Sequence, residues 1–443
     1  GDGSFNNMSG ISGNSNFIPT YQSENSLDAS FSYVSDDFYG FMEPGEGGAE
    51  NMGSFTLDIG TGRLPAKSAE EALALYRKIK HSVDTKTMKD WRNNILFVGD
   101  DEDGNIHMAQ ANGLADKVAS SFPRFAIKKV MLDAYPQVTT SSGATYPEAS
   151  RIIINNLMKG LLIFNYTGHG SESGLAHEHI LMAEDLKKLQ NIDNLPLFIT
   201  ATCEFSRFDD LKEVDGTFYE NTSAGELSLV NPEGGSIALI TTTRIVYSDD
   251  NHVLNTKLYD VIFEKDSNGN YYKLGEVLKT AKNTMGTNRN KLNFILLGDP
   301  ALTLAIPGYH IVTDSLNGIP VDEPIDIMKA FSKIRISGHV EDGNGNIQET
   351  YTGTVYPSVF DKTRKITTLS NDLNATPMQF NSREDLLYKG KASVTNGRFS
   401  FEFMVPKDIT YSYGPGKIVY YSTDRQIDAN GYFDSFVIGG TSE

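Results

Sequence analysis

The sequence contains a single cysteine, Cys203, among 443 residues. An intrachain disulfide is therefore excluded, and the redox compartment stays open because an unbridged chain folds in either environment. Long apolar runs are missing too. Stretches such as 161–166 have the length of a strand and are far shorter than a helix that spans a bilayer.

Positive charge is scarce, with 39 Lys and Arg against 57 Asp and Glu, a net charge of −18. This balance excludes nucleic acid as a partner, because its phosphates would be repelled. The sequence also lacks an HExxH motif and a phosphate-binding GxxxxGK[ST] motif. The segment 177–179, His-Glu-His, has no third ligand nearby and is interpreted as a surface feature, so no metal ligands are predicted there.

Apolar runs of strand length alternate with helical patterns between residues 68 and 307. Because each strand is continuously apolar, the pattern predicts an α/β domain with a mostly parallel sheet and helices on both faces. The predicted strands are 94–101, 128–134, 161–166, 196–201, 236–243 and a short closing strand within 296–307; the predicted helices are 68–81, 113–122, 147–160, 183–192, 251–264 and 274–286.

After Pro307 the pattern changes to short alternating strands separated by turn residues, which predicts an all-β, Ig-like sandwich over 308–443. The catalytic subdomain is then expected over 88–307. Residues 1–87 are expected to form an N-terminal subdomain that is incomplete at its start, because the Gly- and Ser-rich opening resembles a loop already in progress.

Two reactive side chains follow two successive strands of the predicted sheet. His169 lies just after 161–166, and Cys203 lies two residues after 196–201, with one helix between. Strands of such a unit usually lie side by side, so both side chains should leave the same edge of the sheet. A cysteine sulfur that attacks a carbonyl, with an imidazole that protonates the leaving amine, is the chemistry of a cysteine peptidase.

Backbone N–H groups are expected to stabilise the oxyanion of this reaction. Gly170 is one candidate donor, because a residue without a side chain does not crowd the pocket, and the N–H of Cys203 is the other. Glu204 would disfavour the thiolate of its neighbour, so a neutral resting thiol is expected.

Several stretches resemble known peptidases. His-Gly after one core strand and a cysteine after the next are typical of caspase-like cysteine peptidases, and NYTGHGSE (165–172), PLFITATC (196–203) and LLGDPALTL (296–304) resemble the gingipain family. ATCEFSRFDD (201–210), NPEGGSIALITTTR (231–244) and 387–409 are similar to the C-terminal signal peptidase, or sortase, of the type IX secretion system. Thr202 departs from the family, where alanine commonly precedes the cysteine.

The resemblance implies proteolysis at the cell surface of a Gram-negative bacterium, peripherally attached to the outer membrane. Its substrates would be secreted cargo proteins that carry a C-terminal signal domain. The partners implied are an outer-membrane β-barrel anchor and anionic lipopolysaccharide, whose amine could accept the acyl group in place of water.

The resemblance also implies further site residues. An acid from the end of strand 94–101 would orient His169, and the pattern favours Glu102 with Asp101 second; the alternative is a solvated acidic turn. Arg244 and Tyr247 would bind substrate, unless they are a surface arginine and a packed tyrosine. No cofactor is required, but the acids at 100–105 allow a structural calcium ion.

Two other functions stay open at this stage. One is a broad secreted gingipain-like protease without ligase activity. The other is a non-enzymatic surface-binding module, against which the presence of both His169 and Cys203 argues.

Overall fold

The computed structural model describes residues 18–23, 30–47, 52–141, 143–215, 217–372 and 375–442. The Gly- and Ser-rich opening, and the expectation about where the chain begins, lie outside this part. No helix in the described part of the chain is long and apolar enough to cross a lipid bilayer.

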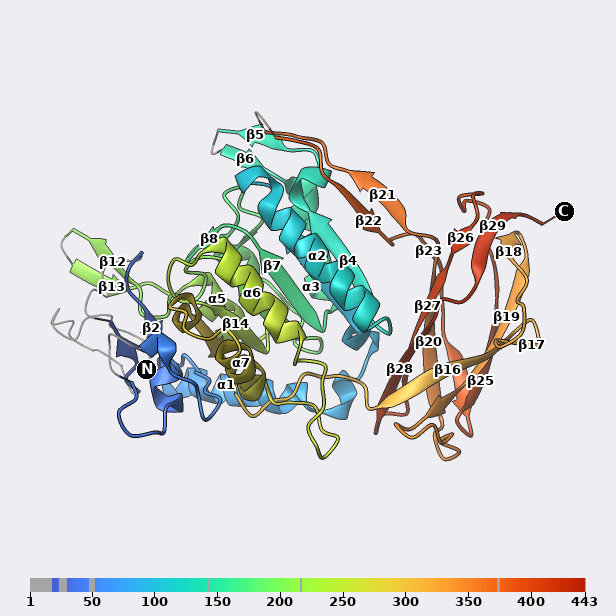
Figure 1. The fold of residues 1–443 in the computed structure, drawn as a ribbon, viewed down its shortest axis with the longest axis horizontal. Helices are drawn as coiled ribbons and strands as arrows, with labels where there is room; N and C mark the ends of the chain where they lie inside the picture. Colours follow the sequence, from blue (N-terminus) through green and yellow to red (C-terminus); the bar gives the residue numbers. More distant parts are fainter. Residues whose placement is uncertain are drawn as a thin grey trace.

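A six-stranded sheet forms the centre of the first domain (Figure 1). The order is β15-β14-β11-β7-β3-β4, and all neighbouring pairs are parallel except β14 with β15. The mostly parallel sheet is therefore confirmed. The strands are β3 (Asn94–Gly99), β4 (Ala126–Met131), β7 (Ile163–Thr167), β11 (Leu197–Ala201), β14 (Ala238–Thr242) and β15 (Phe294–Leu297).

Helices cover both faces of this sheet, as predicted. Along β3, Ile95 and Phe97 belong to one apolar core, whereas Leu96 and Val98 belong to another. This alternation follows from the two-residue period of a strand, and it explains why a strand buried on both faces is continuously apolar. The first core contains α2 (Ile106–Ser121), α6 (Ser248–Tyr259) and α7 (Leu274–Asn283); the second contains α1 (Ala69–Ser82), α3 (Pro147–Lys159), α4 (Ala183–Lys187) and α5 (Ala224–Val230).

Two element predictions are corrected. Helix α2 begins at Ile106 rather than at 113, because Met108 and Ala111 already face the core. The closing strand is β15, which ends at Leu297 and runs antiparallel to β14, whereas it was expected within 296–307.

The C-terminal part of the chain is all-β, as predicted. Its large sheet runs in the order β17-β16-β19-β25-β24-β20-β27-β28, and β16 also pairs with β28, so the sheet closes on itself. The Ig-like sandwich form and the exact domain boundaries stay predictions. The strands named here are β16 (Tyr309–Leu316), β17 (Ile319–Pro320), β19 (Lys333–Glu341), β20 (Gly353–Phe360), β24 (Ala392–Thr395), β25 (Arg398–Met404), β27 (Lys417–Thr423) and β28 (Asp428–Phe433).

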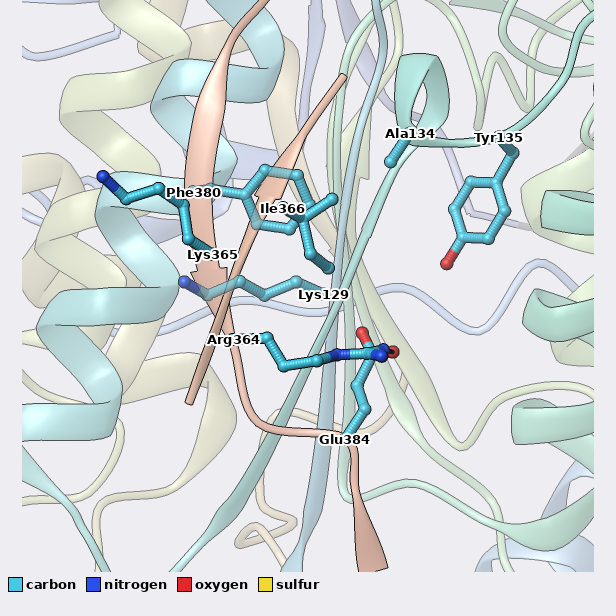
Figure 2. A pocket seen from close by; sticks show the side chains of 8 residues that line it. All are labelled: Lys129, Ala134, Tyr135, Arg364, Lys365, Ile366, Phe380 and Glu384. Atoms are coloured by element: carbon cyan, nitrogen blue, oxygen red, sulfur yellow. Dashed lines mark ion pairs between the residues drawn. The ribbon is translucent and has the colours of Figure 1, made fainter. Parts of the chain in front are cut away.

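A β-hairpin of the all-β domain lies along the first domain. Its strands are β21 (Arg364–Thr367) and β22 (Gln379–Ser382), and we call it the arm (Figure 1). Phe380 of the arm packs against Met108, Ala111 and Met131. A pocket of about 390 Å³ lies beside this contact, lined by Ile366 and Phe380 of the arm and by Lys129 and Tyr135 of the first domain (Figure 2).

The arm continues into a loop that bonds to the first domain near its acidic turn. The backbone carbonyl of Thr376 accepts a hydrogen bond from Asn105 Nδ2 at 2.6 Å. The carboxylate of Asp133 accepts hydrogen bonds from the N–H groups of Ser370 and Asn371, both at 2.8 Å. The all-β domain thus reaches the residues that precede α2.

Candidate active site

The ends of β7 and β11 bring His169 and Cys203 to one edge of the sheet. The two strands are parallel neighbours, with Thr167 opposite Ala201. Beyond them, the N–H of Gly168 donates to the carbonyl of Ala201 at 3.3 Å. His169 and Cys203 each stand two residues past the last paired position, so both leave the carboxyl edge of the sheet, where open α/β folds bind ligands.

The backbone around His169 is fixed from both sides. Its N–H donates to Asp100 Oδ2 at 2.8 Å, and its carbonyl accepts from the Tyr166 hydroxyl at 2.6 Å. Gly168 is required here, because a Cβ at this position would lie 2.2 Å from Asp100 Cβ. The glycine before the histidine therefore allows a close approach of the two strand ends rather than supplying flexibility.

The imidazole of His169 faces two carboxylates. Its Nε2 lies 3.0 Å from Asp103 Oδ2 and 3.5 Å from Glu102 Oε2, and about a third of the side chain is exposed. Both contacts involve Nε2, which leaves Nδ1 for a reacting group. Glu102 is thus near the histidine, as predicted, but Asp103 is nearer.

Asp101, the second predicted acid, does not contact His169. It is buried and accepts a hydrogen bond from the Tyr146 hydroxyl. Asp103 was not predicted, because the family pattern favoured Glu102 and Asp101 from the same acidic cluster. Residues 103–105 form a turn, with φ angles of 54°, 67° and 72°, and this left-handed path directs Asp103 toward the imidazole.

Two further histidines surround the ring. His177 stacks on His169 with ring centroids 4.8 Å apart, and its Nδ1 lies 2.8 Å from Glu102 Oε2. His107 meets the ring edge-on at 5.1 Å. His177 is exposed, in agreement with the interpretation of 177–179 as a surface feature, although it lies against the ring of His169; Glu178 is buried, so for this residue the interpretation is wrong.

Cys203 is half-buried, with Sγ 3.7 Å from the carbonyl of Val246. Burial raises the pKa of its thiol; the contact with the Val246 carbonyl lowers it by less, and the charge of Glu204 adds a smaller rise. The direction agrees with the expected neutral resting thiol. The thiol requires an external base or a substrate-bound state to become a nucleophile.

A sharp turn presents the cysteine. Glu204 has a φ of 51°, which is unfavourable for a residue with a side chain, and its N–H donates to the carbonyl of Arg244 at 3.3 Å. Its carboxylate pairs with Arg207 at 2.8 Å. These contacts hold the chain in a conformation that turns it away immediately after Cys203.

The N–H of Gly170 makes no hydrogen bond to the neighbouring strand, and its role as an oxyanion donor stays a prediction. Gly170 begins β8 (Gly170–Ser171), which pairs with β9 (Gly174–Leu175), and it lies opposite Leu175. The N–H of Ala176 donates to the carbonyl of His169, so the pair at Gly170 is a non-bonded one and its N–H points away from β9. The role of the Cys203 N–H stays a prediction.

The predicted substrate contact of Arg244 is contradicted. Its side chain is fully buried, pairs with both carboxylate oxygens of Asp209 at 2.8 and 2.7 Å, and donates to the Ser32 hydroxyl at 2.9 Å. Arg244 holds the N-terminal segment against the sheet edge. Tyr247 is 61% exposed just before α6, where a ligand could reach it.

Among the described residues, three groups of side chains could hold a metal ion: Asp100 with Asp101 and Glu178; Glu102 with His169 and His177; Asp103 with His107 and His169. The first group is buried and consists only of carboxylates. Burial raises the pKa of Asp100 to about 7, of Asp101 to about 6 and of Glu178 to about 7. Asp101 Oδ1 and Glu178 Oε2 have no hydrogen-bond partner among the described residues, and oxygen donors of this kind suit Ca²⁺.

The α/β fold, with a histidine and a cysteine at the carboxyl ends of neighbouring parallel strands, is that of a cysteine peptidase. The model of peptidase family C25 matches residues 1–305, so the chain belongs to this family, the gingipains. No curated protein sequence matches the chain significantly.

One solved structure supports this fold, and further matches are weaker. The chain is similar to the Arg-specific cysteine proteinase gingipain R (TM-score 0.50, 15% identity, covering 92% of this chain and 79% of that one). It also matches a complex of Porphyromonas gingivalis RgpB pro- and mature domains (TM-score 0.48, 16% identity, 90% and 81% coverage). Dimeric latent PorU from the same organism matches at a TM-score of 0.34 and 19% identity, over 96% of this chain and 34% of that one. The chain therefore spans about a third of the length of that protein.

Proposed function

We propose that this cysteine peptidase acts as a sortase that removes the C-terminal signal domain from type IX secretion cargo. The single observation that supports a peptidase mechanism most directly is the placement of His169 and Cys203 on paired strand ends. The specialised role is supported by the sequence resemblance at 201–210, 231–244 and 387–409.

The reaction would proceed through a thioester. Cys203 Sγ bonds to the carbonyl carbon of the scissile peptide while its proton passes to His169. The oxyanion accepts a hydrogen bond from the Gly170 N–H, and His169 returns the proton to the departing amine as the C–N bond breaks. Water then releases a carboxylic acid, or an amine on anionic lipopolysaccharide forms a new amide and regenerates the thiol.

The partners and location follow from this role. We propose that the protein acts on the outer face of the outer membrane, held there peripherally by an outer-membrane β-barrel protein. The all-β domain would be an Ig-like module that accompanies the peptidase, as the family resemblance implies. No cofactor takes part in the proposed reaction.

We also propose a structural calcium ion at Asp100, Asp101 and Glu178. The two orphaned carboxylate oxygens support it, because buried carboxylates without a cation or a donor are unfavourable. Calcium should raise the melting temperature of the chain, and Glu178→Gln should remove most of that gain. The absence of a calcium-dependent shift in the unmodified chain would contradict this proposal.

The test of the enzyme is a trapping experiment. The chain is mixed with a truncated cargo that carries its C-terminal domain, and intact mass spectrometry follows both the cut products and the acyl group on Cys203. We expect an acyl adduct at Cys203 that is cleaved faster when a small amine is added, and the amine should then be joined to the new C-terminus of the cargo. His169→Ala should slow adduct formation, and Cys203→Ala should abolish it without unfolding the chain.

Two outcomes would replace the proposal. Turnover of many unrelated peptides at rates similar to the cargo would favour a broad secreted protease. Modification of Cys203 by a peptide-like electrophile at a rate that does not depend on His169 would favour a non-enzymatic surface module.

A further inference from the structure

Histidine is rare in this chain, with eight residues in all, yet three of them gather at the candidate active site. His107 and His177 both contact the ring of His169, one edge-on and one stacked. A solvated acidic turn would not require this arrangement. Imidazole nitrogens beside a carboxylate are instead the donor set that zinc and its neighbours among the transition metals prefer.

His107 is the unusual member of this group. Its side chain is only 7% exposed, yet neither Nδ1 nor Nε2 has a hydrogen-bond partner among the described residues. Nε2 lies 3.4 Å from Asp103 Oδ2, which is within the range of an ion pair but is not a hydrogen bond. A buried polar group without a partner is costly, so a buried imidazole whose nitrogen faces a carboxylate and a second imidazole indicates a missing ligand.

Asp103, His107 and His169 offer three donor atoms that all lie within 4.8 Å of one another. Asp103 Oδ2 is shared, 3.0 Å from His169 Nε2 and 3.4 Å from His107 Nε2. Zinc bound at about 2.0–2.2 Å to each of three protein donors keeps a fourth, open position for water. The spread of the three atoms is compatible with such a site after small side-chain movements.

We propose that Asp103, His107 and His169 bind a divalent transition-metal ion, represented by Zn²⁺, and that occupancy switches the peptidase off. The ion takes the lone pair of His169 Nε2, so the proton of the neutral ring stays on Nδ1 and Nδ1 can no longer accept the proton of Cys203. The inhibitory part rests on the peptidase function; the binding part does not.

The neighbouring group Glu102–His177 is the matched alternative on the same ring. His177 and Glu102 already contact each other at 2.8 Å, and the His177 side chain is 65% exposed, so water satisfies it without a metal. A metal ion at this group would have to replace the contact between His177 Nδ1 and Glu102 Oε2. The buried and unsatisfied His107 makes the other group the stronger site, and His177→Ala is the control.

Binding is measured by titration calorimetry with Zn²⁺ on the full chain carrying Cys203→Ala, with calcium present throughout. This variant removes a competing thiol and makes the readout independent of activity. We expect one site, weakened about 10-fold or more by Asp103→Asn or His107→Gln and changed less than about 3-fold by His177→Ala. Asp103 is 60% exposed, so its variant keeps the proposal testable if His107→Gln does not fold.

The switch is then tested on the peptidase itself. Zn²⁺ should inhibit peptide cleavage by the unmodified chain, a zinc-selective chelator should restore it, and Asp103→Asn should raise the inhibitory concentration by the factor found in calorimetry. No binding to the Cys203→Ala chain, or equal weakening by His177→Ala, would overturn the site. Binding without inhibition of an active peptidase would overturn the switch, and neither result bears on whether the chain cleaves cargo.

Discussion

Asp103 and Glu102 are the carboxylates that lie within 4 Å of His169 Nε2, and they should not contribute equally. Asp103 is closer, at 3.0 Å against 3.5 Å, and Glu102 also pairs with His177. We expect Asp103→Asn to lower kcat about 10-fold, because the amide keeps the size but removes the charge that orients the imidazole. Glu102→Gln should cost less, and KM should change little in both.

Asp101 provides the control for this pair. Its carboxylate accepts from the Tyr146 hydroxyl and does not reach His169, so Asp101→Asn should alter thermal stability more than kcat. Steady-state kinetics and melting curves on the three variants separate the effects. A larger loss of kcat in Asp101→Asn than in Asp103→Asn would restore the sequence-based assignment.

The thiol of Cys203 gives a pH-dependent prediction. Burial raises its pKa, so the thiolate becomes populated only above the ordinary thiol value of about 8.5. The rate of alkylation by iodoacetamide should therefore rise with a midpoint above that value. Glu204→Gln should move the midpoint down, because it removes a like charge. A midpoint near neutral pH would instead indicate a thiolate paired with a protonated imidazole.

Single residues differ in how far sequence reveals them. His169 and Cys203 follow apolar strands, and the rule that ligands bind at the carboxyl ends of parallel strands is sufficient to place both at one edge of the sheet. The choice between Glu102 and Asp103 depends on the left-handed turn at 103–105, which local sequence does not orient. The buried position of Arg244 depends on its hydrogen bonds to Ser32 and Asp209. These residues are distant in the chain, so the burial could not be predicted from the sequence.

Among the elements, the hairpin of β8 and β9 lies between the two reactive residues: β8 follows His169 directly and packs against Thr202, the neighbour of Cys203. A Cβ on Gly170 would lie 2.5 Å from the Oγ1 of Thr202, the residue before Cys203. We expect Gly170→Ala to push β8 away from the end of β11 and lower kcat/KM about 100-fold, comparable to the loss of an oxyanion donor. Peptide kinetics of the variant measure this.

Gly113 in α2 is the matched control for that substitution. A Cβ there meets nothing within 4 Å, and its φ is not in the left-handed region. Gly113→Ala should leave kinetics unchanged and stabilise the chain by about 0.5–1 kcal/mol, because alanine favours a helix interior. Equal activity of the two alanine variants would show that Gly170 is not required at the site.

Strands were predictable from the sequence where both of their faces are buried. Strands buried on both faces read as continuous apolar runs, so β3, β7, β11 and β14 were found. An apolar run carries no information on strand direction, which is why the antiparallel pairing of β15 was not foreseen. The start of α2 was missed because Gly113 interrupts its helical pattern.

At the scale of the molecule, the arm connects the all-β domain to the active site. It packs on α2, whose first turn carries His107, and its loop bonds to Asn105 in the turn that places Asp103. Nothing in the sequence of the arm, a short hairpin among many, indicates this contact. The pairing of β16 with β28, which closes the sheet, was not predicted from the sequence either. Both the arm contact and this pairing join segments that are distant in the chain.

Two phenylalanines test whether the arm supports catalysis. Phe380 in the arm and Phe403 in the all-β core are both 5% exposed. Either change to alanine should cost about 3–5 kcal/mol of unfolding free energy through the cavity it leaves. Only Phe380→Ala should also lower kcat, because it loosens the packing on Met108 and Ala111 beneath His107 and Asp103. Denaturant unfolding and peptide kinetics at a temperature where both variants stay folded compare them, and a fall in kcat that is equal in the two variants would mean that the arm contributes stability alone.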